Sequence, residues 1–453
     1  MDQIIDSLSE YTTFLNFIDL PDEVVHQAKR LLIDTLGCAL GGYTSEPSKI
    51  ARALAATVSS TQPATILGSG QTTSLELATF ANGVMMRYLD FNDGYTGKES
   101  GHPSDAIAAV LSPAEVARGD GKRVITATVQ AYETFCRLCD AVCVRDRGFD
   151  HVTLGVMAST VGASKALGLP REKVKQALNL SVAANLALYQ TRIGEVSLWK
   201  GCAFANASRN AVFAVQLAAL GLSGPAPIFS GAGGFFRAVS QEPFTLEPFG
   251  GQGQSFKILE CTIKGFPLGL YSQTVVDAAL QVRRQLPRLD DIQQVHIATL
   301  RTAVNIMAGD AEKWRPATRE TADHSMPYTA AVALMYGTVE ARHFEAEYLQ
   351  NPALLDLVQK VTVSVSEEAN RRAPEAMLSQ VEVITASGGR YVATVPYHRG
   401  HYKNPMSDQE VEAKFRALAR DVLSPRQTDT LLDSLWHLEQ VEDIGQVIRL
   451  MHI

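Results

Sequence analysis

The sequence predicts a mainly α protein with two parts, a large multi-helical domain and a smaller α/β (α+β) lid domain. The N-terminal part consists of successive segments whose apolar residues recur at the spacing of a helix. After Phe266-Pro267 the pattern changes to one helix followed by segments that alternate like strands. Toward the C-terminus helical patterns return. We therefore expect residues 1–266, completed by helices in 404–453, to form the helical domain, and residues 267–403 to form the lid.

The clearest helix of the N-terminal part begins after Leu20-Pro21. Asp22 and Glu23 lie in its first turn, where the helix dipole favours anions, and Gly41-Gly42 is a typical helix end. The segment 178–188 is apolar or small on nearly every side, which predicts a central position in the helical core. Similar patterns predict helices over 74–89, 106–117, 124–142, 154–167, 172–188 and 203–220.

The lid segment begins with a helical pattern and continues with strands. Residues 381–395 alternate on both sides of Ser387-Gly388-Gly389, which predicts a β-hairpin. The helix is expected over 272–285, and the other two strands are expected over 292–300 and 361–365.

Two further segments have a local interpretation. Ser407 and Asp408, just after Asn404-Pro405, are candidate N-caps for terminal helices that we expect to rejoin the helical domain. The glycine-rich segment Gly231–Phe236 could be mistaken for a phosphate-binding loop, but no strand precedes it and it lacks the G-K-[ST] ending. It therefore predicts a turn.

Composition and charge exclude several classes of protein. The chain has 453 residues, and its 41 basic and 48 acidic residues give a net charge of −7. This balance, without a Lys/Arg cluster, argues against a nucleic-acid partner. Because the first basic residue is Lys29, we expect neither a signal peptide nor an Arg-rich transit sequence.

One stretch without charged residues, Asn210–Phe236, has to be considered as a possible membrane-spanning segment. Its apolar part, Ala211–Leu222, is about half of the ~20 residues that a membrane-spanning helix needs, and glycines and prolines follow it. We expect a buried core helix followed by a loop, in a soluble cytoplasmic protein that has no membrane partner.

Cys136, Cys139 and Cys143 form a C-x2-C-x3-C pattern that could indicate an iron–sulfur site. The surrounding residues, however, have the pattern of one amphipathic helix, on which Cys136 and Cys143 would lie about 10 Å apart along the axis. Free cysteine is also among the most frequently buried residues. We therefore expect core thiols and no bound metal.

The segment Tyr88–Asp105 contains Asp90, Asp93, His102 and Asp105 beside three glycines and a proline. Aspartate and histidine are common in general acid–base catalysis, and loops on a rigid scaffold often carry such groups. On these residues alone a polar surface turn is an equally good interpretation.

Further polar side chains stand in apolar or glycine-rich surroundings. Taken singly, each has an ordinary structural explanation, such as a lysine stem packed on apolar surface or a tyrosine in the core. They are His151, Lys200, Lys264 and Tyr328, together with Arg319, Asp323 and His324 of the loop that ends at Tyr328.

Taken together, these segments resemble the MmgE/PrpD family, which includes 2-methylcitrate dehydratases, cis-aconitate decarboxylases and iminodisuccinate epimerases. The resemblance covers essentially the whole chain, and the motifs occur in the family's order. The matching segments are Ala28–Gly42, Leu89–Asp93, Gly101–Asp105, Gly221–Pro225, Gly231–Phe236, Lys264–Pro267 and Thr318–Tyr328.

The resemblance implies a cofactor-independent homodimer with a helical domain, an α/β lid and an active site between them. Two positions depart from the decarboxylase version of the family. Gly94 stands where a Thr is common, and Gly269 stands where a His, or an acid in some dehydratases, follows the Phe-Pro pair. The Gly269 departure weakens the decarboxylase alternative. The active-site positions that the resemblance implies are Asp90, His102, His151, Lys200, Lys264 and Tyr328.

The family's reactions act on small di- or tricarboxylates, and this chemistry assigns tasks to the implied residues. Removing a proton beside a carboxylate builds negative charge, which fixed cations such as Lys200, Lys264 and Arg319 would stabilise. A β-hydroxyl must be protonated as it leaves, so a positioned acid is needed. The candidates for proton transfer are His102, His151 and Tyr328, with Asp90 orienting a histidine or holding the loop.

We therefore expect a hydro-lyase that dehydrates a 2-methylcitrate-like tricarboxylate without metal or cofactor, with His102 as a principal proton-transfer group. The wording of Thr318–Ser325 is most similar to the dehydratases of the family. Decarboxylation or epimerisation is the alternative within the family, and an inactive helical ligand-binding protein is the alternative outside its chemistry. Which histidine is the base and which the acid stays open.

Overall fold

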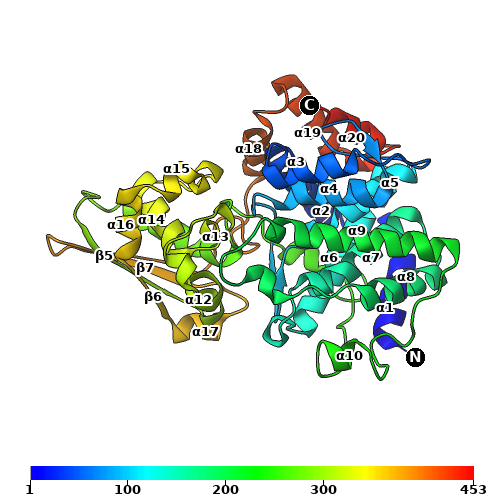
Figure 1. Ribbon diagram of the computed structural model, residues 1–453, viewed down its shortest axis with the longest axis horizontal. Helices are drawn as coiled ribbons and strands as arrows, with labels where there is room; N and C mark the ends of the chain where they lie inside the picture. The colour runs from blue at the N-terminus through cyan, green and yellow to red at the C-terminus, as the bar shows by residue number, and fades with distance from the viewer. Residues whose placement is uncertain (1) are drawn as a thin grey trace.

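The computed structural model describes residues 2–453, which form two lobes that lie side by side along the longest axis (Figure 1). The larger lobe is helical and contains both chain termini, and the smaller lobe contains a sheet with its helices. This mainly α architecture with a smaller α/β part confirms the predicted fold class. Every helix of the described residues is too short or too polar to cross a bilayer.

Helix α7 (Val152–Leu167) is central in the larger lobe, and nearly all of its residues are buried. Its glycines allow close packing, because a Cβ atom at Gly155 would lie only 2.3 Å from the Phe204 ring. Helix α7 contacts α5 (Ala108–Val116), α6 (Gly121–Ala141), α8 (Arg171–Ala184) and α9 (Trp199–Leu220).

The remaining elements of the larger lobe surround this centre. Helix α2 (Asp22–Gly42) begins and ends as predicted, and the Ser407 hydroxyl accepts from the Glu410 amide and caps α18 (Asp408–Ala419). The predicted turn at Gly231–Phe236 is present before α10 (Phe235–Ala238). The others are α1 (Gln3–Phe14), α3 (Glu46–Ala55), α4 (Leu75–Arg87), α19 (Pro425–Trp436) and α20 (Gly445–Leu450), with the short strands β1 (Ala64–Thr65), β2 (Thr72–Thr73), β3 (Tyr95–Thr96) and β4 (Ser100–Gly101).

The smaller lobe contains a four-stranded sheet with the order β6-β5-β7-β8. Strand β5 (Ile292–Thr299) is parallel to β6 (Val361–Val365), and β7 (Ser379–Thr385) is antiparallel to both β5 and β8 (Arg390–Val395). The predicted hairpin is confirmed, and Gly388 adopts a φ of 87° in its turn. The helices are α11 (Gln273–Arg283), α12 (Arg301–Ala308), α13 (Arg319–Ala322), α14 (Met326–Tyr336), α15 (Ala346–Leu349), α16 (Pro352–Gln359) and α17 (Glu367–Arg372).

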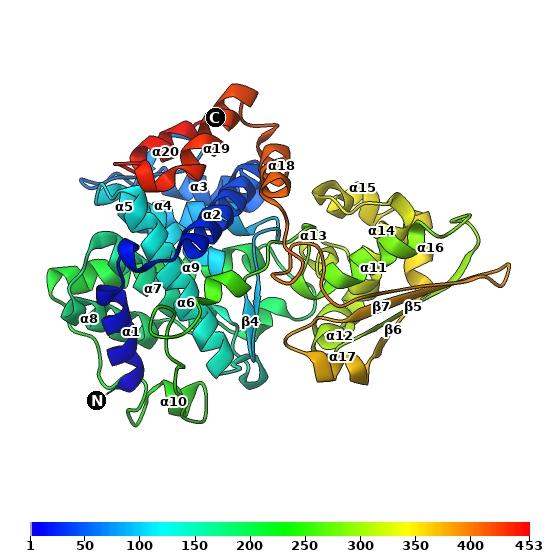
Figure 2. The ribbon, with the colours of Figure 1, turned by 180° about the vertical axis from the view of Figure 1, so that it is seen from behind.

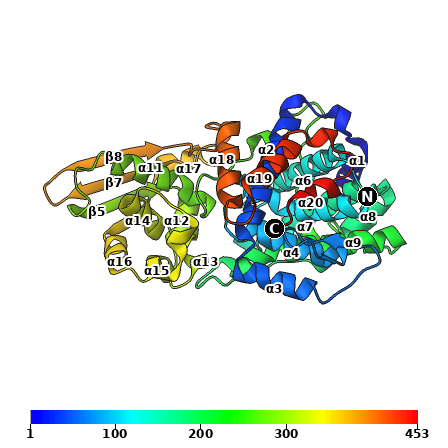
Figure 3. The same cartoon turned by 90° about the horizontal axis from the view of Figure 1, so that it is seen from above.

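Each lobe has its own hydrophobic core. The core of the larger lobe includes residues between Ile4 and Ile263 and residues between Val411 and Met451, so the C-terminal helices pack back onto it. The core of the smaller lobe lies between Leu268 and Val395, where α11 packs on β7 and β8. Helix α18 stands at the junction of the lobes, as seen from behind and from above (Figures 2 and 3). We propose that the domains divide in the same way, into 1–266 with 404–453 and 267–403.

Two expectations about the helices are wrong. The helix predicted over 172–188 ends at Ala184, and Leu186 and Leu188 are 48% and 64% exposed rather than central. The side-chain amide of Asn185 donates to the Ser181 carbonyl at 2.7 Å. The chain then runs extended beside Phe149.

Helix α9, which has no charged residue from Asn210 to its end at Leu220, is not buried on all sides either. Phe213 and Leu220 are 54% and 88% exposed, although the rest of this helix packs against α4, α7 and α8. The absence of charges therefore predicts an apolar surface here. It does not predict whether other parts of the same chain cover that surface.

The cysteine pattern spans the end of α6. Cys136 and Cys139 are buried on the helix, as predicted, whereas Cys143 lies beyond its last residue, Ala141. Burial raises the pKa of the Cys136 and Cys139 thiols well above the ordinary value. Both are therefore neutral thiols of the core.

Candidate active site

A cavity lies at the junction of the two lobes, and both lobes contribute to its wall. Cavities between domains are a common place for ligand sites, because side chains from two rigid bodies converge there. The larger lobe contributes Arg87, Glu99, Ser100, Gly101, His102, Arg145, His151, Tyr189 and Arg192, and the smaller lobe contributes Gly269, Leu270, Tyr271, Ile306, Met307 and His324.

The loop Tyr88–Asp105 is folded against the helices and is buried, so it is not a surface turn. Its shape depends on hydrogen bonds between its own side chains. Asn92 Nδ2 donates to Asp105 Oδ1 at 2.6 Å, and Ser104 Oγ donates to Asp93 Oδ1 at 2.5 Å. Asp93 and Asp105 thus hold the loop in place.

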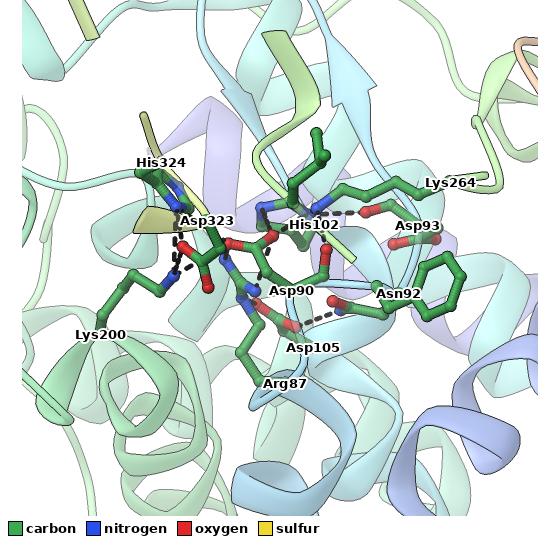
Figure 4. Close-up of polar contacts among 12 residues, drawn as sticks. Arg87, Asp90, Asn92, Asp93, His102, Asp105, Lys200, Lys264, Asp323 and His324 are labelled. Carbon is green, nitrogen blue, oxygen red and sulfur yellow. Dashed lines mark hydrogen bonds and ion pairs between the residues drawn. The ribbon is translucent and has the colours of Figure 1, made fainter. Parts of the chain in front are cut away.

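Asp90 is the centre of a buried charge network in this loop (Figure 4). Arg87 Nη1 lies 3.0 Å from Asp90 Oδ1, Lys200 Nζ lies 3.3 Å from Oδ2, and His324 Nδ1 lies 3.4 Å from Oδ2. Lys264 Nζ contacts Oδ1 and donates to the Asp90 carbonyl at 2.9 Å. Burial alone would raise the pKa of Asp90, but Arg87, Lys264 and Lys200 outweigh it and hold that pKa well below its usual range.

The backbone at Asp90 is in the left-handed region, with a φ of 51°. This conformation is unfavourable for a residue with a side chain, and it persists only where surrounding contacts impose it. The ion pairs of Asp90 supply those contacts.

Asp323 connects this network to the smaller lobe. Its Oδ1 lies 2.5 Å from Lys200 Nζ and 2.6 Å from His324 Nδ1. Burial and the nearby Lys200 charge lower the pKa of His324 to about 4, so its ring is neutral. Lys200, which belongs to the larger lobe, therefore bridges a carboxylate of each lobe.

Ligand atoms of Asp90, Asp323 and His324 lie within 4.8 Å of one another, as in a metal site. Lys200 and Lys264 already bring positive charge to these carboxylates. Their ammonium groups therefore supply the charge that a metal ion would supply, and they would repel such an ion.

His102 is held through Nδ1, which lies 2.6 Å from the carbonyl oxygen of Asp93. A carbonyl can only accept, so Nδ1 carries the hydrogen and Nε2 keeps its lone pair. That Nε2 lies 3.9 Å from Asp90 Oδ1. Burial, together with the charges of Arg87 and Lys264, lowers the pKa of His102 well below its usual value. His102 is therefore a neutral imidazole at the cavity wall, with the lone pair on Nε2.

His151 is held in a different way. Its Nδ1 lies 2.7 Å from Asp150 Oδ1, and Arg192 Nε lies 2.6 Å from Asp150 Oδ2. Burial opposes the charge of Asp150, but Arg192 and His151 outweigh it and keep the pKa of that carboxyl below its usual range. Within the described residues, Nε2 of His151 has no hydrogen-bond partner. The rings of His151 and His102 meet edge to face, with centroids 5.8 Å apart.

Asp150 and Arg192 reach His151 because two segments run side by side. Phe149 pairs with Leu188 in an antiparallel bridge, and the Asp150 amide donates to the Ala187 carbonyl at 2.8 Å. The extended segment that follows α8 thus brings Arg192 next to Asp150.

The structure brings Asp90, His102, His151, Lys200 and Lys264 together, and their roles in the reaction stay predictions. Neither lysine lines the cavity, because both are engaged by Asp90 or Asp323 behind its wall.

Tyr328 and Arg319 do not join this group. Tyr328 is buried in the smaller lobe, where its hydroxyl donates to the His343 carbonyl at 2.6 Å. Arg319 Nη1 donates to the Ala341 carbonyl at 3.0 Å, and its guanidinium lies 4.9 Å from the centroid of the Tyr88 ring. Their predicted roles in proton transfer and substrate binding stay predictions.

Sequence reasoning assigned no role to several residues of the site. Arg87 had a local signal, since it ends a helix just before the loop, and His324 stands next to Asp323 in a recognised motif. The others lie in stretches without a distinctive pattern, and only the fold brings them to the cavity. They are Arg145, Asp150, Tyr189, Arg192 and Tyr271.

Apolar side chains occupy the space beside Gly94 and Gly269, the two positions that depart from the decarboxylase version of the family. A Cβ atom at Gly94 would lie 2.8 Å from Leu270 Cδ2, and one at Gly269 would lie 2.7 Å from Met307 Cε. Leu270 and Met307 also line the cavity, together with Ile306. One part of the cavity wall is therefore apolar.

The fold and the site define a two-lobed helical protein whose interlobe cavity carries paired histidines and buried ion pairs. Residues 6–247 match the MmgE/PrpD N-terminal domain, and residues 266–438 match the MmgE/PrpD C-terminal domain. The chain belongs to the MmgE/PrpD family.

Similar proteins with named activities include cis-aconitate decarboxylases and 2-methylcitrate dehydratases. The chain is 27% identical to cis-aconitate decarboxylase of Homo sapiens over 451 residues, which covers 95% of this chain and 91% of that protein. It is 30% identical to 2-methylcitrate dehydratase of Escherichia coli (strain K12) over 358 residues, which covers 73% and 71%. It is 28% identical to 2-methylcitrate dehydratase of Salmonella typhimurium over 436 residues, which covers 89% and 87%. Both kinds of relative are lyases, and the choice between their reactions depends on the site.

Proposed function

We propose that the protein is a hydro-lyase that dehydrates a 2-methylcitrate-like tricarboxylate, without metal or cofactor, in the cavity between the lobes. The observation that carries the proposal is the pair of histidines on one cavity wall, one held by a carbonyl and the other by a carboxylate. Dehydration needs one group that takes a proton and one that gives a proton, and this pair supplies both.

His102 is the proposed base. Its Nε2 takes the proton from the carbon beside a substrate carboxylate, and the electron pair of that C–H bond forms the new double bond. The negative charge that builds up is stabilised by the buried cations around Asp90, with Arg87 on the cavity wall. Lys200 and Lys264 act in this proposal by holding Asp90 and Asp323.

His151 is the proposed acid. The C–O bond of the β-hydroxyl breaks as Nε2 of His151 delivers a proton to the oxygen, so that water leaves. The Asp150 carboxylate at Nδ1 fixes the ring and stabilises its doubly protonated form before the transfer. Exchange with solvent then returns His102 and His151 to their starting protonation states.

The apolar part of the wall supports a methyl-bearing substrate and a dehydratase. Leu270, Ile306 and Met307 form a surface suited to the methyl group of 2-methylcitrate. Leu270 and Met307 also occupy the space beside Gly94 and Gly269, where the decarboxylase version of the family carries Thr and His.

The direct test is an ultraviolet absorbance assay with 2-methylcitrate, citrate and cis-aconitate, before and after dialysis against a chelator. We expect an unsaturated tricarboxylate to form from 2-methylcitrate, faster than from citrate, at a rate the chelator leaves unchanged. Carbon dioxide release from cis-aconitate would support the decarboxylase instead. If none of the three acids reacts, the alternative of an inactive ligand-binding protein is supported. Loss of activity on chelation would contradict metal independence.

A further inference from the structure

We propose that Arg145 binds a carboxylate of the substrate, and that the hydroxyls of Ser100 and Tyr271 complete this carboxylate subsite. The inference rests on the proposed function, because it names part of the site that would hold the tricarboxylate. Arg145 lies on the cavity wall with Ser100 and Tyr271.

The guanidinium of Arg145 is fixed and largely removed from water. Its side chain is 14% exposed, and its Nη2 lies 2.7 Å from Glu99 Oε1. The other oxygen of Glu99 accepts the backbone amides of Val144 at 3.1 Å and of Arg145 at 3.0 Å. Glu99 therefore holds both the main chain and the side chain of Arg145. A cation fixed in this way binds a ligand without losing much side-chain freedom.

Arg145 differs from the other cations of the site because fewer of its N–H groups are engaged by carboxylates. Arg87 is shared by Asp90 and Asp105, the latter at 3.3 Å, and Lys200 is shared by Asp90 and Asp323. Arg145 makes one ion pair, with Glu99, through one nitrogen of its fork.

Arg192 also has one carboxylate partner, but that partner is Asp150, which holds His151. A guanidinium carries five N–H donors, so Arg145 keeps an edge that can take a carboxylate through two parallel hydrogen bonds.

A hydrogen-bonded pair of hydroxyl groups lies on the same wall. Ser100 Oγ and Tyr271 Oη are 2.7 Å apart, one from the larger and one from the smaller lobe. This hydroxyl pair can donate one hydrogen to an anion while keeping its internal bond. A guanidinium and a hydroxyl pair on one wall are a combination that recognises a carboxylate.

The proposed reaction requires that the substrate be held at more than one of its carboxylates. His102 acts beside one carboxylate, and the other carboxylates of a tricarboxylate must be held away from the reacting bond. A carboxylate bound by Arg145 would fix the substrate at a second point, and such positioning raises the rate of the chemical step.

The test measures binding of tricarballylate, a tricarboxylate that has no hydroxyl to eliminate, by isothermal titration calorimetry. The variants are Arg145→Gln and Arg145→Lys. The matched control is Arg147→Gln, because Arg147 lies two residues further on the same turn and pairs with Glu242 at 2.8 Å.

We expect Arg145→Gln to raise the Kd of tricarballylate roughly tenfold to a hundredfold, the usual effect of losing a charge-assisted bond. Arg145→Lys should fall between wild type and Arg145→Gln, because it keeps the charge and loses the fork. Arg147→Gln should bind like the wild type.

Arg145→Gln leaves Glu99 without its ion-pair partner, and this could affect folding. The double variant Glu99→Gln/Arg145→Gln removes both charges together, and it should show the same loss of tricarballylate binding.

The outcomes separate the subsite from the proposed function. Wild-type affinity in both Arg145→Gln and the double variant would overturn the subsite, even where 2-methylcitrate is dehydrated normally. The absence of tricarballylate binding to the wild type would overturn it as well. Arg145-dependent binding by a protein that dehydrates neither 2-methylcitrate nor citrate would support the subsite and contradict the proposed function.

Discussion

In the proposed mechanism His102 accepts a proton and His151 donates one, and their ring centroids lie 5.8 Å apart. A carbonyl at Nδ1 leaves His102 neutral and able to accept a proton, whereas a carboxylate at Nδ1 stabilises His151 after it has gained one. The sequence identifies both histidines. It does not identify their partners, because the partner of His102 is a backbone atom of Asp93.

A first prediction at this scale concerns Lys264, which is fully buried and paired with Asp90. Lys264→Met removes one of the cations that compensate a buried carboxylate. We expect the free energy of unfolding in urea to fall by about 3–5 kcal/mol, the usual cost of breaking a buried ion pair. The control is Lys403→Met, which removes an exposed ion pair with Glu375 and should leave stability unchanged. Equal stabilities of the two variants would contradict a structural role of Lys264.

A second prediction concerns Asp93, where burial raises the pKa from 3.8 to about 7. The folded state therefore binds this proton more tightly than the unfolded state does. The resulting stabilisation is complete below about pH 4 and is lost as the pH rises through about 7. Asp93→Asn keeps an acceptor oxygen for Ser104 and has no such proton.

Differential scanning calorimetry at a series of pH values checks this prediction. The Tm of Asp93→Asn minus that of the wild type should increase as the pH rises from about 4 to about 7, because only the wild type loses stabilisation there. A difference that stays constant with pH would show that the Asp93 carboxyl titrates normally.

At the scale of elements, the sequence predicts helix and hairpin ends that local residues determine, but it does not predict an end that depends on a tertiary contact. Helix α2 and the hairpin around Gly388 were predicted because prolines, acidic residues and glycines mark their ends. The end of α8 at Ala184 was missed because it depends on a pairing with the distant Phe149. Tyr328 lies in the core of the smaller lobe, a position that only packing determines, and its predicted role stays a prediction.

The loop that carries Asp90 gives a prediction at this scale, because Gly94 packs under Leu270. Gly94→Ala should lower the free energy of unfolding by about 1–3 kcal/mol, the usual cost of overpacking. The double variant Gly94→Ala/Leu270→Ala should lose less than the sum of its single variants, since Leu270 is the side chain in conflict.

Gly233→Ala is the control for this urea titration, because a Cβ atom at that position has nothing within 4 Å. Additive effects of Gly94→Ala and Leu270→Ala would contradict the proposed contact.

At the scale of the whole molecule, one side of α9 exposes large apolar side chains. Phe213 and Leu220 are seven residues apart, and Trp199, which is also exposed, lies two such repeats before Phe213, with the polar Asn206 at the repeat between them. Apolar residues at this spacing form a stripe along one side of a helix, as in helix–helix contacts. We propose that a second copy of the chain covers this stripe and that the protein is a homodimer.

Light scattering after size-exclusion chromatography tests the dimer. The wild type should elute as a dimer, and Phe213→Asp should weaken it toward a monomer, because a buried charge at a contact is costly. Ile18→Asp, at an exposed residue outside α9, is the control and should remain dimeric. A monomeric wild type, or a Phe213→Asp variant as dimeric as the control, would contradict this assignment.

The two lobes meet where Lys200 bridges Asp90 and Asp323, and the proposed chemistry takes place on the cavity wall beside this bridge. In the proposed mechanism His102 takes the proton in a dehydration. This role is tested by kcat/KM for 2-methylcitrate, measured for the wild type, His102→Ala and the exposed control His437→Ala. We expect turnover by the wild type and the control and a loss of roughly 10²–10⁴-fold in His102→Ala with an unchanged Tm. Near-normal turnover by His102→Ala, or no dehydration by the wild type, would contradict it.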